Sequence, residues 1–249
     1  MRLGITTVLA AALAAAAGAT ETTPEAAAYF NKGVELYNAG KFDEAIAQFE
    51  QSIAADPKLV EADEWIATIY LRQGKNVAAV ERYQKLLARK PSTAARVSLG
   101  LAYLQTGDNA AALKTLREAV ALDPQNKVGW NNLSMACLRS GDNAGARDAA
   151  EKALALDVGY APAYVNLGNC YLAQNQPADA ITAFDKALAL DGAQLDAYYG
   201  LGEAYAYAGD NKQAGDNYLL YLKKGGGDQS RRGRAVGWLW DHGRGAEIP

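Results

Sequence analysis

Residues 163–171 read Ala-Tyr-Val-Asn-Leu-Gly-Asn-Cys-Tyr, and Ala180, Ile181 and Phe184 follow them at helical spacing. This stretch sets a glycine among large residues on one predicted helix, and an alanine ahead of an aromatic residue on the next. Two antiparallel helices approach closely where their side chains are small, and large side chains fill the space beside the contact. The stretch therefore predicts a helical hairpin whose two helices cross near Gly168 and Ala180.

The small residues of this hairpin recur along the chain at a nearly constant period. The glycine position holds a small residue in six copies, separated by 34, 33, 34, 34 and 34 residues. These residues are Gly33, Ala67, Gly100, Ser134, Gly168 and Gly202. The alanine position is alanine in every copy, at Ala45, Ala79, Ala112, Ala146, Ala180 and Ala214. Because one such hairpin cannot bury its apolar face alone, the copies are expected to stack on one another.

A third periodic series marks the turn inside each hairpin. It consists of Gly40, Gly74, Gly107, Gly141, Asn175 and Gly209. Glycine, and after it asparagine, is the residue that most readily takes the positive φ of a helix C-terminal cap. Pro57, Pro91 and Pro124 then end the second helix of the first three hairpins. Each copy is thus predicted to be helix, tight turn, helix.

This pattern of small and large residues resembles the tetratricopeptide repeat family. The resemblance implies an all-α fold, a right-handed α-solenoid of about six helix-turn-helix repeats with a C-terminal capping helix. The solenoid is placed at 20–224, with repeats at 26–59, 60–92, 93–126, 127–160, 161–194 and 195–224. It also implies a protein–protein interaction scaffold or adaptor that binds an extended peptide or a partner helix in its concave groove. A self-associating homo-oligomeric scaffold is the alternative.

Residues 1–19 have the pattern of an export signal. Arg2 precedes an apolar run over residues 3–17, and Ala17-Gly18-Ala19 fits a small-x-small cleavage site. The mature chain is then expected to begin at Thr20 and to be periplasmic or secreted, in a bacterial envelope complex. The alternative is that the run is an alanine-rich helix of the solenoid itself.

The sequence shows little that indicates catalysis. It has no glycine-rich phosphate loop after a strand, no nucleophile elbow and no HExxH, and His242 is its single histidine. We therefore expect no catalytic residue, no metal and no cofactor, and we keep an enzyme or enzyme-regulatory subunit as the alternative of another class. The formal net charge of −3 argues against nucleic acid as a partner.

The two cysteines, Cys137 and Cys170, lie at similar heights on the first helices of adjacent predicted repeats. In an exported protein an even number of cysteines makes a disulfide between them possible. The alternative is two buried thiols that pack as small apolar residues.

The resemblance implies that the first helices of repeats four to six line the peptide-binding groove. The expected groove residues are Asn131, Asn132, Met135, Arg139, Asn166, Asn169, Tyr199, Glu203 and Tyr207. An asparagine amide both donates and accepts, so it matches a peptide backbone, or it bonds a neighbouring helix instead. The tyrosines are expected to be exposed anchors for a partner, with packing against the C-terminal helix as the alternative.

The first three repeats are predicted to present a more apolar groove. Its residues are Phe30, Val34, Tyr37, Val97, Leu101 and Leu104. Phe30 and Val34 stand where relatives that clamp acidic C-terminal tails carry Lys and Asn, so the resemblance does not extend to that clamp. An apolar groove of this kind would bind an amphipathic helix or a second copy of the chain.

The C-terminal segment 225–249 departs from the period. Residues 225–227 are all glycine, and a helical stripe of Ala235, Val236, Leu239 and Trp240 follows. The stripe predicts a helix that caps the last repeat, as solenoids require for solubility. The alternative makes Arg231, Arg232, Arg234 and Trp238 a contact patch for an anionic partner or lipid headgroups. The last residues up to Pro249 are expected to be disordered.

Overall fold

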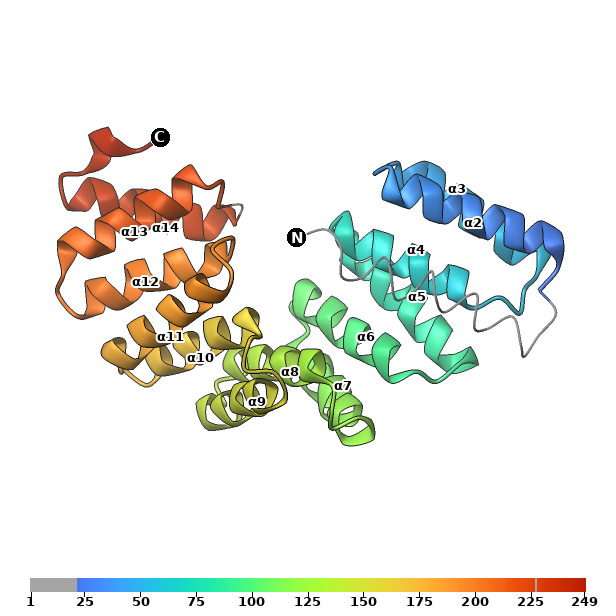
Figure 1. Ribbon diagram of the computed structural model, residues 1–249, viewed down its shortest axis with the longest axis horizontal. Coiled ribbons are helices and arrows are strands. Elements are labelled where there is room, and N and C mark those ends of the chain that lie inside the picture. Colours follow the sequence, from blue (N-terminus) through green and yellow to red (C-terminus); the bar gives the residue numbers. More distant parts are fainter. Residues whose placement is uncertain (1–21, 227) are drawn as a thin grey trace. The chain divides into compact units, whose positions relative to one another are not determined.

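The computed structural model describes residues 22–226 and 228–249, so the export signal predicted at 1–19 lies outside the described residues. The chain divides into two compact units, Met1–Thr106 and Gly107–Pro249. Within the described residues, thirteen α-helices and one short 3₁₀ turn make up the regular structure, and there is no strand (Figure 1). The predicted all-α helical repeat solenoid is confirmed.

The N-terminal unit contains five described helices that pack in chain order. They are α2 (Pro24–Asn38), α3 (Phe42–Ala55), α4 (Glu61–Arg72), α5 (Asn76–Arg89) and α6 (Thr93–Thr106). The helices α2 and α3 form one antiparallel hairpin and α4 and α5 form the next, and α3 packs on α4 where the two hairpins meet.

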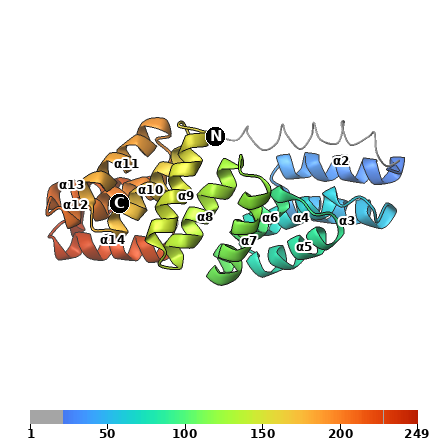
Figure 2. The ribbon, with the colours of Figure 1, turned by 90° about the horizontal axis from the view of Figure 1, so that it is seen from below.

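The C-terminal unit, taken by itself, also consists of helices that pack in chain order (Figure 2). Its helices are α7 (Asn109–Leu122), α8 (Lys127–Arg139), α9 (Asn143–Leu156), α10 (Ala161–Ala173), α11 (Pro177–Leu190), α12 (Leu195–Tyr207), α13 (Asn211–Lys223) and α14 (Gln229–Asp241), followed by η1 (Gly245–Glu247). The first helices α8, α10 and α12 contact one another in sequence, and α14 packs on both α12 and α13. This row of first helices forms the face on which the predicted groove residues lie.

The turn inside each hairpin has the predicted left-handed residue. Asn175 has φ 57°, and the glycines of the series have φ between 72° and 84°. Asn175 is the one residue other than glycine with a positive φ among the described residues. A side chain there costs free energy that glycine avoids, and asparagine bears this cost best among the others. The turn prediction is confirmed.

Three glycines of the first series, Gly33, Gly168 and Gly202, lie directly against aromatic rings. A Cβ atom built on Gly168 would lie 2.6 Å from the ring of Phe184, and one built on Gly200 would lie 2.3 Å from the same ring. Phe184 on α11 is fully buried, so a single ring fills the space between α10 and α12. Gly33 with Phe49, and Gly202 with Tyr218, repeat this contact in other hairpins. The period in the sequence therefore reflects one glycine–aromatic contact that is used several times.

The fourth repeat replaces this contact with a polar one. Its first helix carries Ser134 where the others have glycine or alanine, and Ala150 stands where they have a large side chain. The Ser134 hydroxyl donates a 2.7 Å hydrogen bond to the backbone oxygen of Ala146 and is fully buried. In this repeat a hydrogen bond from Ser134 to α9 takes the place of the glycine–aromatic contact. This bond explains how α8 and α9 pack closely without an aromatic residue between them.

The expectation of an exposed apolar groove in the N-terminal unit is wrong for most of its residues. Phe30, Tyr37, Val97 and Leu104 are all buried. The rings of Tyr37 and Trp65 lie 4.8 Å apart, and the rings of Phe30 and Phe49 lie 5.4 Å apart. The ring of Trp65 contacts both Tyr37 and Phe49. These aromatic residues are core of the unit and are not available to a partner.

Candidate partner-binding groove

A cavity of about 270 Å³ opens on the C-terminal unit where α8, α10, α12 and α14 converge. Four of the nine predicted groove residues line it: Met135, Arg139, Asn166 and Asn169. Leu138, Val165, Asp196 and Arg231 complete the lining. The cavity combines an apolar part with amide, guanidinium and carboxylate groups, the mixture typical of a site that orients a bound chain. We call it the groove cavity.

The predicted asparagines bond to each other across the helices. Asn166 on α10 donates from its side-chain amino group to the backbone oxygen of Asn131 at 3.0 Å and to its side-chain oxygen at 2.9 Å. Asn131, Asn132 and Asn166 are all buried, and only Asn166 also lines the cavity. The pair therefore fixes α8 against α10. Asn166 and the half-buried Asn169 beside it are the two amide side chains that line the cavity.

Tyr199, Glu203 and Tyr207 do not line the groove cavity. Tyr199 is 4% exposed, so the expectation that it is an exposed anchor is wrong. Its hydroxyl donates to Glu203 at 2.9 Å, and its ring packs against Tyr218 and Tyr221 on α13. Burial, and then the neighbouring Glu203 carboxylate, raise the pKa of Tyr199 well above its usual value. Tyr207 is 69% exposed at the end of α12, one turn beyond Glu203.

The C-terminal helix supplies Arg231, the one lining residue that comes from outside the predicted repeats. Asp228 begins α14 by accepting a 2.7 Å hydrogen bond from the backbone N–H of Arg231. The Arg231 guanidinium forms an ion pair with Asp196 on α12. It also lies 5.4 Å from the centroid of the Tyr199 ring, over which Arg234 is placed at 5.6 Å. The buried ring of Tyr199 therefore packs beneath Arg231, a residue of the cavity lining.

Sequence reasoning missed Leu138 and Asp196, although a signal for both was present. They lie on α8 and α12, the first helices of repeats four and six, which the resemblance already assigns to the groove. Arg231 follows no repeat period, so its place in the cavity could be found only from the packing of α14. It belonged to the alternative contact patch for an anionic partner, whose other members do not line the cavity.

Cys137 and Cys170 are both free and buried in the structure, which does not contain the possible disulfide. Burial raises the pKa of the Cys170 thiol to about 11 and shifts that of Cys137 upward as well. Both thiols are therefore protonated at neutral pH and pack as small apolar side chains.

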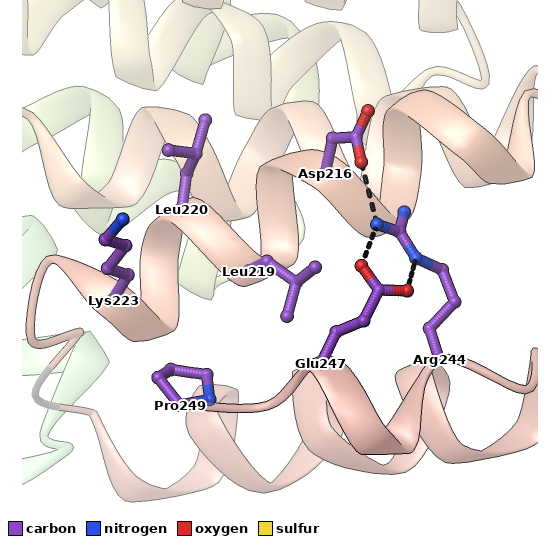
Figure 3. A pocket seen from close by; sticks show the side chains of 7 residues that line it. All are labelled: Asp216, Leu219, Leu220, Lys223, Arg244, Glu247 and Pro249. Carbon is purple, nitrogen blue, oxygen red and sulfur yellow. Dashed lines mark hydrogen bonds and ion pairs between the residues drawn. The ribbon is translucent and has the colours of Figure 1, made fainter.

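The C-terminal segment is ordered against α13, which corrects the expectation of a disordered end. Arg244 donates to Asp216 at 2.8 Å and to both carboxylate oxygens of Glu247 at 2.7 Å (Figure 3). A side chain at Gly215 would meet the Arg244 guanidinium at 2.3 Å, so glycine at this position allows the arginine to reach α13. These contacts border a second cavity of about 390 Å³ above Leu219 and Leu220. Arg244, Asp216 and Glu247 at this cavity pair with one another, so it is the weaker candidate for a partner-binding site.

Neither a metal centre nor a membrane span is visible in the part of the chain that the structure describes. No group of three His, Cys, Asp or Glu side chains in it could hold a metal ion. None of its helices combines the length and the apolar character needed to cross a bilayer.

Comparison with known families identifies the repeats. One tetratricopeptide repeat model matches residues 9–60, 30–94, 66–127 and 97–161, and a second matches residues 161–192. Together the matches run from residue 9 to residue 192 of the 249 residues. The chain belongs to the tetratricopeptide repeat family. Proteins of this family are protein–protein interaction scaffolds, so binding of another protein is the activity that the fold provides.

The curated relatives of this tetratricopeptide repeat chain are longer than the regions they share with it. It is 31% identical over 90 residues to the photosystem I assembly protein Ycf3 of Synechococcus sp. (strain CC9311), covering 34% of the chain and 52% of that protein. It is 30% identical over 109 residues to the beta-barrel assembly-enhancing protease of Yersinia pestis, covering 43% of the chain and 22% of that protein. Both relatives are thus named for assembly, and the Yersinia pestis relative is also named as a protease.

Among solved structures, the tetratricopeptide repeat chain is similar to PilW, described as a widely conserved type IV pilus biogenesis factor. The TM-score is 0.72 at 19% identity, over 85% of this chain and 99% of the PilW chain. At this identity the likeness concerns the fold alone.

Proposed function

We propose that this chain is a scaffold whose C-terminal unit holds a segment of another protein in the groove cavity. The observation that carries the proposal is the convergence of Met135, Arg139, Asn166 and Asn169 on one cavity. Asn166 and Asn169 supply amide groups for the backbone of an extended segment, while Met135 contacts its apolar side chains. Arg139 adds a charged group at the end of α8.

Capture with a blocked groove tests this function. Asn169 is half-buried at the cavity, so Asn169→Trp is expected to fill the cavity and to abolish capture of proteins that the unmodified chain retains from a bacterial envelope extract. Gln51→Trp, on an exposed position of α3, is the matched control and should capture as the unmodified chain does. Both variants should keep the helical melting profile. Equal capture by the Asn169→Trp variant would place the binding surface elsewhere, and recovery of the chain alone would favour self-association.

We further propose that the scaffold works in a bacterial envelope, exported by the signal predicted at residues 1–19. The assembly-related name of the Yersinia pestis relative supports an envelope role. The intact mass of the protein purified from its native cells is expected to correspond to a chain that begins at Thr20. A mass that retains residues 1–19 would contradict cleavage at this site.

A further inference from the structure

The groove cavity carries more positive than negative charge, although the chain as a whole is negative. Arg139 and Arg231 line the cavity, and Asp196 is the one acidic residue of its lining. Asp196 forms an ion pair with Arg231, so its charge is already compensated within the protein. The formal net charge of the whole chain is −3. The lining of the cavity, with two arginines and one aspartate, therefore has a formal charge of +1 in a negative chain, which favours an acidic ligand.

Arg231 is oriented before any ligand arrives. Its guanidinium lies over the ring of Tyr199. That ring packs against Tyr221 of α13, and its hydroxyl donates a hydrogen bond to Glu203. Its side chain is 31% exposed, so it is reachable from solvent but is not free to sample many rotamers. A guanidinium that is already placed loses less conformational entropy on binding a carboxylate than a solvated lysine does.

The ion pair with Asp196 indicates that the Arg231 guanidinium binds a carboxylate. The side chain of Asp196 is 57% exposed and reaches the guanidinium from α12, at the solvent edge of the cavity. A guanidinium has five N–H donors, so Arg231 has donors for a second carboxylate beside Asp196 or in its place. The cavity is recessed between helices and contains two asparagine amides, features that suit a peptide chain better than the surface of a bilayer.

We propose that the groove cavity selects a partner segment with an acidic side chain, and that Arg231 binds its carboxylate. This inference rests on the proposed function. It makes α14, a helix outside the repeats, a determinant of specificity as well as a cap. The asparagines bind the backbone beside the acidic residue, and Tyr199 acts as a positioning residue for Arg231.

An array of random peptides tests the inference with the full chain. The peptides are acetylated, amidated and about 12 residues long, enough to cross the cavity when extended, and each is made with either Glu or Gln at its centre. We expect the Glu forms to bind about tenfold more tightly, as a charge-assisted hydrogen bond allows. Arg231→Ala should remove this preference, and Arg232→Ala, an exposed arginine beside it on the same helix, should keep it. Asp196→Asn should strengthen binding of the Glu forms, a gain that misfolding cannot produce.

The outcomes separate this inference from the function on which it rests. Peptides that bind and are lost with Asn169→Trp, but that show no preference for Glu, would overturn the inference and leave the groove function intact. A preference for Glu that survives Arg231→Ala would overturn it as well. A chain that binds no peptide would contradict both. Binding to phosphatidylglycerol vesicles that depends on Arg231, without any peptide preference, would assign this arginine to a lipid surface instead.

Discussion

Phe184→Ala is expected to lower the free energy of unfolding by ~3–5 kcal/mol, as truncation of a fully buried aromatic side chain does. The effect should lie at the upper end of this range because one ring serves two contacts. Phe184 fills the space above Gly168 on α10 and above Gly200 on α12. With no side chains on those glycines, neither helix can fill the space that truncation leaves.

Urea unfolding followed by far-UV circular dichroism measures this loss. Tyr207→Ala is the matched control, because it also truncates an aromatic residue but one that is 69% exposed. Its effect should stay within about 0.5 kcal/mol. Equal losses from the two variants would contradict the account of the glycine–aromatic contact.

Asp63→Asn is the second change with a large expected effect. The Asp63 side chain is 7% exposed and accepts from Arg82 at 3.0 Å and from Arg89 at 2.8 Å. The variant leaves two partly buried guanidiniums without their shared carboxylate. Loss of one partner from a fully buried pair costs about 3–5 kcal/mol, but both arginines keep some contact with water, so we expect ~2–3 kcal/mol here.

The same urea titration tests this prediction against Asp43→Asn. Asp43 carries the same carboxylate, but its side chain is 84% exposed and lies 3.8 Å from Lys75. The control should change the free energy of unfolding by less than about 0.5 kcal/mol. If the loss from Asp63→Asn were no greater than that of the control, the cluster would not hold α4 and α5 together.

The fold could be predicted from the sequence because its determinants are local and repeated. Glycines of the first series, such as Gly168, lie against an aromatic ring, and each turn residue, such as Asn175, takes a positive φ that few residues tolerate. Six copies of the same constraint identify the hairpins even where one copy, with Ser134 and Ala150, departs from the rest.

The candidate site could be predicted only in part, because position within a repeat does not determine exposure. Met135 and Tyr199 both stand at expected groove positions, yet one lines the cavity and the other is buried beneath α14. Which of them a partner can reach depends on α14, the helix that follows the repeats. Because α14 does not belong to the repeat pattern, its packing cannot be predicted from the period of the sequence. The same helix brings Arg231 to the cavity.

The measurement that tests the central claim most directly is the affinity of the captured partner, once purified, for three forms of the full chain. Isothermal titration calorimetry would compare the unmodified chain, Asn169→Trp in the groove cavity and Gln51→Trp on α3. The account predicts that Asn169→Trp weakens binding by at least about tenfold, roughly 1.4 kcal/mol, while Gln51→Trp has no effect. Equal affinity for all three forms would show that the partner does not occupy the groove cavity.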